Sequence, residues 1–196
     1  MPGPVGVLAL QGDFREHIAV LKALGADARP VRRPQELADV AGLVIPGGES
    51  SVIDKLSRTF DLAGPLRSAI SEGLPVYGTC AGLIMLADRI RDGIDGQQTL
   101  GGLDIEVRRN AFGSQGESFE VDLDVPAVGD TPVHAVFIRA PVVEYLGESV
   151  TALATLDDGR VVAVESGNLL GTSFHPEMTG ETRFHEYFLD KVRQRG

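Results

Sequence analysis

Short apolar runs alternate with helical patterns through the first half of this 196-residue sequence. Four of these runs predict buried strands, at residues 5–10, 28–32, 42–45 and 74–78. After the first run, apolar residues recur at the spacing of one helix face. Strands that alternate with helices in this way build a parallel sheet with helices on both faces. We therefore expect an α/β protein.

Capping signals mark where the first helices begin and end. Asp13 and Glu16 have the spacing of a capping box, and Gly25 is suited to the turn that ends a helix. Ser50 or Ser51 would cap a later helix, because their hydroxyl oxygens can accept hydrogen bonds from free backbone N–H groups.

The second half has a different pattern. Residues 119–125 alternate apolar and acidic side chains, which is typical of a half-exposed strand. Asp-Gly at 158–159 and Gly-Asn at 167–168 each lie between β-rich runs and predict hairpins. A last helix is expected at about residues 181–193. With no repeat or linker in view, residues 1–196 are expected to form a single domain. Its fold would be an open, mostly parallel sheet with helices on both faces and an antiparallel extension.

The charge balance and the single cysteine exclude several classes of protein. The chain has 18 basic and 28 acidic side chains, a net charge of −10, and an acidic surface repels nucleic acid. One cysteine cannot form an internal disulfide, which is consistent with a reducing compartment. No signal peptide or membrane-spanning run is visible, so we expect a cytoplasmic protein with no membrane partner.

Cys80 is the first candidate functional residue. It is the central residue of Gly78-Thr79-Cys80-Ala81-Gly82, between a predicted strand and a helical run from residue 81 to about 91. A nucleophile in G-x-C-x-G would be raised on a sharp turn, like the serine of G-x-S-x-G hydrolases. The helix start would favour its thiolate, and the N–H of Ala81 could donate to an oxyanion. The alternative is a buried packing cysteine in a plain turn.

His175 is the best candidate for the base. Pro176 disfavours a helix at His175, and in an extended segment Glu177 would face the same way and orient the imidazole. The alternative is an isolated structural His-Pro-Glu, and a metal site would lack a further ligand at a familiar spacing. His17 and His185 lie in helical patterns and are predicted to be surface or packing residues.

The glycine-rich segment "PGGESS" at residues 46–51 ends the third predicted strand. Ligands bind beside such loops at the carboxyl edge of an open parallel sheet. The adjacent Gly47 and Gly48 would let backbone N–H groups approach an oxyanion, although a simple glycine turn would look the same. The segment lacks the Gly-Lys-Ser/Thr ending of a phosphate-binding loop.

Taken together, these motifs resemble the class I, or triad, glutamine amidotransferases. The resemblance is closest to the glutaminase subunits of pyridoxal 5′-phosphate synthase, the PdxT family, and it covers nearly the whole chain. It is carried by the segments "LALQGDFREH" (8–17), "PGGESS" (46–51), "GTCAGLIMLA" (78–87), "RNAFGSQ" (109–115), "IRAP" (138–141) and "SFHPE" (173–177). The first and fourth segments single out this family.

The resemblance implies a flavodoxin-like fold and the hydrolysis of L-glutamine to glutamate and ammonia. Cys80 would be the nucleophile, His175 the base and Glu177 its orienting carboxylate. Gly48 and Ala81 would serve the oxyanion, and Gln11 would lie in a loop that takes part in activation. The implied glutamine contacts are Gly47, Gly48, Glu49, Arg109, Ile138 and Arg139. The family uses no metal and no cofactor.

The resemblance also implies a partner, because the chain contains no domain to accept ammonia. That partner would be the pyridoxal 5′-phosphate synthase subunit (PdxS-like), in a large hetero-oligomer, and the glutaminase would be weakly active alone. One departure is Ser114 in "RNAFGSQ", where relatives commonly carry arginine. This serine puts in doubt any role for a second positively charged side chain in that loop.

Two rival functions are also compatible with parts of this pattern. A cysteine hydrolase or deglycase of the PfpI type also has a cysteine at a strand-to-helix turn, but it lacks the late His-Pro-Glu motif. A regulatory or scaffold subunit with a degenerate site would need no intact set of Cys80, His175 and Glu177, so the presence of all three argues against it.

Overall fold

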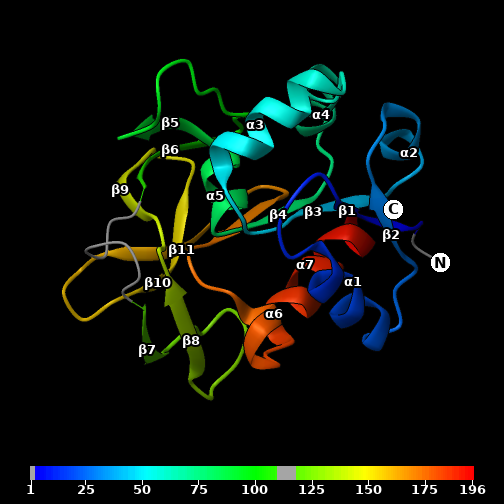
Figure 1. The fold of residues 1–196 in the computed structure, drawn as a ribbon. Helices are drawn as coiled ribbons and strands as arrows, with labels where there is room; N and C mark the ends of the chain where they lie inside the picture. The colour runs from blue at the N-terminus through cyan, green and yellow to red at the C-terminus, as the bar shows by residue number, and fades with distance from the viewer. Residues whose placement is uncertain (1–2, 110–117) are drawn as a thin grey trace.

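A computed structural model describes residues 3–109 and 118–196. Its main sheet has the strand order β2-β1-β3-β4-β12-β11-β9-β6-β5, with β10 paired to β11, and β7 and β8 form a separate antiparallel pair (Figure 1). The strands of the main sheet are β1 (Val5–Leu8), β2 (Ala28–Val31), β3 (Gly42–Ile45), β4 (Val76–Thr79), β5 (Ala87–Arg91), β6 (Leu103–Arg108), β9 (Val142–Leu146), β10 (Thr151–Thr155), β11 (Val161–Ser166) and β12 (Leu169–Thr172). The separate pair is β7 (Ser118–Leu123) and β8 (Val133–Ile138).

Helices cover both faces of this sheet (Figure 1). They are α1 (Phe14–Ala23), α2 (Pro34–Ala38), α3 (Ser50–Thr59), α4 (Ala63–Ser71), α5 (Ala81–Leu86), α6 (Pro176–Thr179) and α7 (Arg183–Arg195). The strands from β2 to β12 in the sheet order run parallel, and β11 and β9 then pair antiparallel. The expected mostly parallel α/β sheet with an antiparallel extension is confirmed.

Two hydrophobic cores hold the layers together. In β3, Leu43 and Ile45 pack into the core under α3, α4 and α5, while Val44 between them packs into the core under α1 and α7. Side chains of a strand point alternately to its two faces, so a central strand must be apolar at every position. This is why β1 and β3 appear in the sequence as unbroken apolar runs, whereas the edge strand β2 contains the exposed Arg29 and Pro30.

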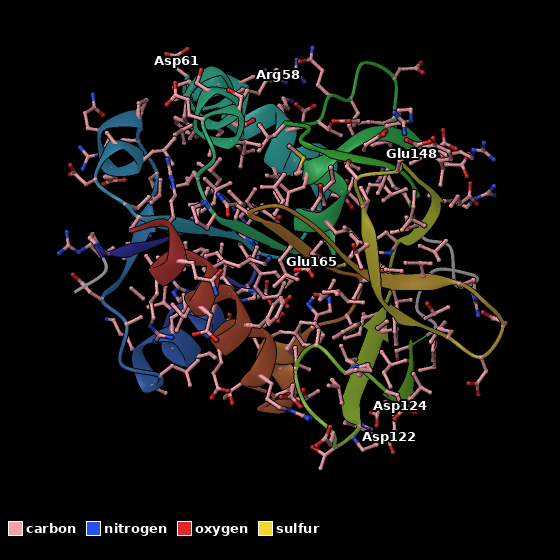
Figure 2. The ribbon with its side chains drawn as sticks, turned by 180° about the vertical axis from the view of Figure 1, so that it is seen from behind. Arg58, Asp61, Asp122, Asp124, Glu148 and Glu165 are labelled. Carbon is pink, nitrogen blue, oxygen red and sulfur yellow. The ribbon has the colours of Figure 1, made fainter. Side chains whose placement is uncertain are left out.

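Charged side chains lie mainly outside these cores. Figure 2 shows Arg58 and Asp61 at the end of α3, and Asp122 and Asp124 on and after β7, all of them exposed. Glu165 on β11 is different, because it accepts a hydrogen bond from the Tyr187 hydroxyl and pairs with Lys191, 2.7 Å away. These contacts tie α7 to the sheet.

Parallel pairing gathers the candidate residues at one edge. Val44 of β3 pairs with Tyr77 of β4, and Leu170 of β12 pairs with the same Tyr77. The carboxyl ends of β3, β4 and β12 are therefore level, and β1 is in register with β3. The loops after these strands begin at a common edge, where open α/β sheets bind ligands.

One expected helix end and two expected capping interactions are wrong. The helix expected over residues 81–91 ends at Leu86, because Ala87 is extended and begins β5, which pairs with β6. Asp13 is the N-cap of α1 as predicted, but its side chain makes no capping hydrogen bond, because its carboxylate lies beside His175 instead. The cap of α3 is Glu49, whose carboxylate accepts from the N–H of Ser51.

Other local predictions are confirmed. Gly25 follows α1 with φ +88° and donates to the carbonyl of Lys22. The turns at 158–159 and 167–168 join antiparallel strand pairs. Residues 118–123 alternate between exposed and less exposed positions. Among the described residues, no helix is both long and apolar enough to span a bilayer.

Candidate active site

Cys80 occupies a sharp turn between β4 and α5. Its backbone has φ +52° and ψ −105°, a left-handed conformation that is rare for a non-glycine residue, and its N–H donates to the carbonyl of Thr172 over 2.8 Å. A Cβ atom on Gly78 would lie 2.5 Å from Gly82, and one on Gly82 would lie 2.0 Å from the carbonyl oxygen of Ile45. Both flanking glycines are therefore required sterically, and strain of this kind is concentrated at functional sites.

Cys80 opens onto a pocket of about 380 Å³. Ten of the eleven predicted site residues line it, and Glu177 lies behind His175. The predicted residues in the lining are Gln11, Gly47, Gly48, Glu49, Cys80, Ala81, Arg109, Ile138, Arg139 and His175. A larger hollow of about 1050 Å³ lies over β5, β6 and β9, but ion-paired surface side chains line it and none of the predicted residues do.

The imidazole of His175 is held between Glu177 and the pocket. His175 Nδ1 is 2.7 Å from Glu177 Oε1, and both residues are only 8% exposed. The segment is not extended as predicted: Pro176 begins α6, and His175 is its N-cap. The pair still forms because the first turn of this helix brings the carboxylate back to the ring.

Electrostatic contacts favour the charged form of His175. Burial alone would lower its pKa, but interactions with Asp13, Cys80 and Glu177 outweigh burial and raise the pKa well above its ordinary value. Gly47 lies against the same ring, since a Cβ there would be 2.6 Å from His175 Cε1. Cys80 and His175 thus line one pocket, and Glu177 is hydrogen-bonded to Nδ1 of the imidazole.

Asp13 is a site residue that the sequence prediction missed. Its Oδ2 lies 3.7 Å from His175 Nδ1, and neither carboxylate oxygen has a hydrogen-bond partner in the described part of the chain. Burial would raise the pKa of Asp13, but interactions with His175 and Glu177 lower it. Burial and the Asp13 carboxylate raise the pKa of Glu177, whereas the hydrogen bond with His175 lowers it. Two carboxyl groups thus share one imidazole.

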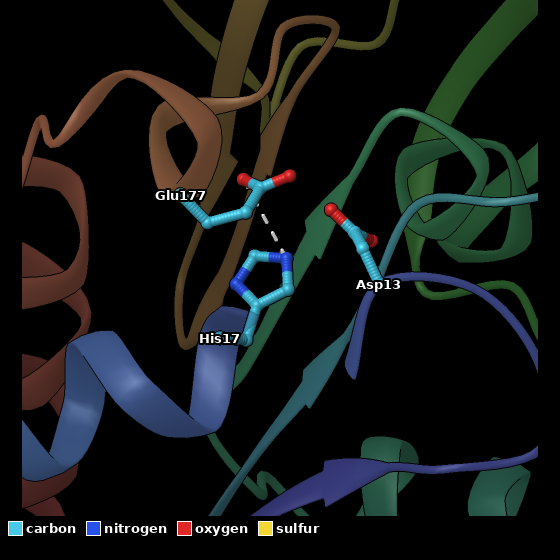
Figure 3. Close-up of side chains that lie close together, drawn as sticks. All are labelled: Asp13, His17 and Glu177. Atoms are coloured by element: carbon cyan, nitrogen blue, oxygen red, sulfur yellow. Dashed lines mark ion pairs between the residues drawn. The ribbon is translucent and has the colours of Figure 1, made fainter. Parts of the chain in front are cut away.

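Of the two predicted alternatives for His17 and His185, surface or packing, the structure shows packing, and the two residues also form a polar network that the prediction missed. Both are fully buried, and His17 Nδ1 is 2.8 Å from His185 Nε2. His17 Nε2 is 3.1 Å from Thr79 Oγ1 and 3.6 Å from Glu177 Oε2 (Figure 3). No signal in the sequence joins these residues, because they come from α1, α7, β4 and α6.

A metal ion is the other chemistry that this cluster could support. Asp13, His17 and Glu177 offer ligand atoms that all lie within 4.8 Å of one another (Figure 3). However, both ring nitrogens of His17 already have polar partners, and His175 competes for both carboxylates. The arrangement therefore fits a hydrogen-bonded network better than a metal centre.

The opposite wall of the pocket carries a charge pair. Arg109 Nη2 lies 2.6 Å from Glu49 Oε1, and its Nη1 lies 3.2 Å from Gln97 Oε1. The N–H of Glu49 donates to Gln11 Oε1 over 2.9 Å, which fixes the Gly47–Glu49 loop against the loop after β1. Arg139, at the end of β8, has φ +47°. The rest of the predicted "RNAFGSQ" segment, including Ser114, lies outside the described residues.

The open parallel sheet, and a cysteine turn facing a His–Glu pair at its carboxyl edge, define the class of the triad glutamine amidotransferases. The profile of the SNO glutamine amidotransferase family matches residues 7–194. The chain belongs to this family.

Solved and curated relatives agree with this assignment. A crystal structure of a glutamine amidotransferase superposes with a TM-score of 0.90 at 50% identity, covering 97% of this chain and 99% of that one. Pyridoxal 5′-phosphate synthase subunit PdxT of Leifsonia xyli subsp. xyli is 73% identical over 97% of this chain and 96% of its own length. The PdxT subunit of Clavibacter michiganensis subsp. michiganensis is 70% identical over 99% of this chain and 93% of its own length.

Proposed function

We propose that this chain is the glutaminase subunit of a pyridoxal 5′-phosphate synthase and hydrolyses L-glutamine to L-glutamate and ammonia. The observation that carries the proposal is the convergence of two separate segments, one with Cys80 and the other with His175 and Glu177, beside a pocket lined by the other predicted residues. The names of the curated relatives supply the pathway.

The mechanism follows from the order of these groups. His175 Nε2 takes the thiol proton, and the Cys80 sulfur bonds to the side-chain amide carbon of glutamine. The C–N bond then breaks, and ammonia leaves with the proton from His175, so a glutamyl thioester remains. Water then attacks the thioester carbon while His175 takes a proton from the water. The C–S bond breaks, which releases glutamate and frees the Cys80 sulfur. Glu177 holds the Nδ1 proton throughout and stabilises the charged ring.

The remaining pocket residues orient the substrate. The Arg109 guanidinium suits the α-carboxylate of glutamine, and the Glu49 carboxylate suits its α-ammonium, so the substrate would separate their present ion pair. Ile138 and Arg139 close the side of the pocket at the end of β8. The N–H groups of Ala81 and Gly48 are the proposed oxyanion donors, each worth roughly 100- to 1,000-fold in rate.

A second polypeptide would receive the ammonia. The relatives are named as subunits of a synthase, and free ammonia would otherwise protonate and disperse in water. Ile138 and Met178 line the pocket and are 38% and 57% exposed, so apolar surface is available beside it for a partner. We propose that this partner is the pyridoxal 5′-phosphate synthase subunit (PdxS-like), in a hetero-oligomer.

Glutamate release, measured with and without that synthase subunit, tests the proposal. We expect the wild-type chain to form glutamate and the partner to stimulate it, and Cys80→Ala to lose turnover while keeping its fold by circular dichroism. His134→Gln is the control, because His134 lies on the exposed side of β8. Activity on glyoxals or peptides instead of glutamine would favour the PfpI-type reading, and turnover that survives in Cys80→Ala would refute the mechanism.

A further inference from the structure

His17 contacts the end of the Glu177 carboxylate that His175 does not use. Glu177 Oε1 is bound to His175 Nδ1 at 2.7 Å, whereas Oε2 lies 3.6 Å from His17 Nε2 (Figure 3). Oε2 has no hydrogen-bond partner among the described residues, and the side chains of both His17 and Glu177 are fully buried. His17 is therefore placed to fix the second oxygen of this carboxylate.

The neighbours of His17 determine where its proton lies. His17 Nδ1 and His185 Nε2 are 2.8 Å apart, so one of these two nitrogens carries the shared hydrogen. If His17 supplied it, His185 would keep its own proton on Nδ1, which is buried and has no partner in the described chain. An unpaired buried N–H is rarer than an unpaired acceptor. His185 is therefore the donor, and His17 carries its hydrogen on Nε2, toward Thr79 and Glu177.

The imidazole rings of His17 and His185 are both neutral at neutral pH. Burial lowers the pKa of His17 to about 4, although the Asp13 carboxylate opposes it. Burial and the nearby His17 lower the pKa of His185 to about 3. His17 therefore presents a fixed N–H dipole to the carboxylate rather than a second positive charge, which would compete with His175 for Glu177.

We propose that His17, held in its tautomer by His185, is a positioning residue for the triad, an inference that rests on the proposed function. Its Nε2–H is hydrogen-bonded to Thr79 Oγ1 and lies 3.6 Å from Glu177 Oε2, so its dipole attracts that oxygen and holds the carboxylate with Oε1 on the Nδ1 proton of His175. The Nε2 atom of His175 is then left to take and hold the proton of the Cys80 thiol. The charged and titratable groups that face this assembly are Asp13, Tyr77, Cys80, His175, Glu177 and His185, with the Thr79 hydroxyl beside them.

Two substitutions at one position separate this role from simple packing. His17→Leu fills much of the same space but removes the N–H. His17→Gln keeps an amide N–H near the place of Nε2, so it should restore what the leucine variant loses. His134→Leu is the matched control, because it removes a histidine from the exposed face of β8. Thermal unfolding of each variant shows whether its fold is retained.

Steady-state glutaminase kinetics, in the presence of the synthase subunit, give the first readout. In His17→Leu we expect kcat to fall about 10- to 100-fold, because small misplacement of catalytic groups has effects of this size. KM should stay unchanged, since Glu49 and Arg109 are untouched. His17→Gln and His134→Leu should keep most of the wild-type kcat. Wild-type kcat in a folded leucine variant, or a loss confined to KM, would overturn the inference.

The pH dependence of Cys80 alkylation by iodoacetamide gives a second readout that needs no glutamine. Followed by mass spectrometry of the Cys80 peptide, the midpoint should move to higher pH in His17→Leu and stay in place in His17→Gln. If wild-type protein releases no glutamate, the proposed function fails, while this profile still tests the positioning. If the leucine variant does not fold, a folded glutamine variant with a shifted midpoint and low kcat refutes the inference.

Discussion

Single glycines determine how closely the reacting groups approach one another. Gly47 lies directly against the His175 ring, and a Cβ there would also come within 3.4 Å of Asp13 Oδ1. Its backbone does not adopt a positive φ, so the requirement for glycine comes from this contact rather than from backbone conformation. The imidazole therefore has no room to retreat from Glu177 and Asp13.

Gly47→Ala should reduce activity more than it reduces stability. The added methyl group would push the imidazole away from its partners, so we expect kcat to fall by about 10- to 100-fold while the protein stays folded. Glutamate release with the synthase subunit measures the first effect, and thermal unfolding measures the second. Gly64→Ala is the control, because a Cβ at Gly64 meets nothing within 4 Å. A fully active alanine variant would show that the His175 ring has more freedom than the structure indicates.

At the scale of elements, the turn between β4 and α5 is the most constrained part of the chain. Gly78 packs on the first turn of α5, and Gly82 packs on the end of β3. The helix therefore lies close against two neighbouring strands, which brings Cys80 to the carboxyl edge of the sheet. The next element shows the limit of local signals: residues 87–91 continue the helical pattern in sequence, but pairing with β6 makes them a strand.

Gly82→Ala should destabilise the fold measurably. Its Cβ would lie 2.0 Å from a backbone oxygen that cannot rotate away, and overpacking of a core typically costs about 1 to 3 kcal/mol. Gly64→Ala in α4 should instead be neutral or stabilising by about 0.5–1 kcal/mol, because alanine favours helix over glycine. Chemical denaturation of both variants measures the change in the free energy of unfolding, which should fall in Gly82→Ala and stay equal or rise in Gly64→Ala. Equal free energies of unfolding in Gly82→Ala and wild type would contradict the close packing at this turn.

At the scale of the whole molecule, the site lies over a buried polar cluster that links the sheet to α1 and α7. The cluster consists of His17, Thr79, Glu177 and His185. Sequence motifs identified the residues that line the pocket, because their chemistry is concentrated in short segments. The buried cluster was not predictable, since its members look like ordinary helical positions until tertiary packing brings them together. For the same reason the contact of the Asp13 side chain with His175 was not predicted, although Asp13 is the N-cap of α1 as expected.

This buried cluster should make stability depend on pH below neutrality. The pKa of His185 is lowered from its ordinary value of 6.5 to about 3 in the folded protein. Between these values the unfolded chain binds a proton that the folded protein does not bind. The contribution of His185 to stability is therefore present above pH 6.5 and is lost as the pH falls toward 3, by up to about 1.4 kcal/mol per pH unit.

His185→Gln isolates this contribution. The variant cannot titrate, so its disadvantage relative to wild type should shrink as the pH is lowered from 7 to 5. Urea denaturation of both proteins at each pH gives the difference in unfolding free energy directly. A difference that does not change with pH would show that His185 is not a buried neutral base.

Trapping of the covalent intermediate tests most directly whether Cys80 is the nucleophile. The complex with the synthase subunit is mixed with glutamine, quenched in acid during turnover and analysed by mass spectrometry. The account predicts a glutamyl adduct that maps to Cys80 and is absent from Cys80→Ser and from samples without glutamine. Glutamate formed at the wild-type rate by Cys80→Ser, or an adduct that maps to another residue, would contradict it.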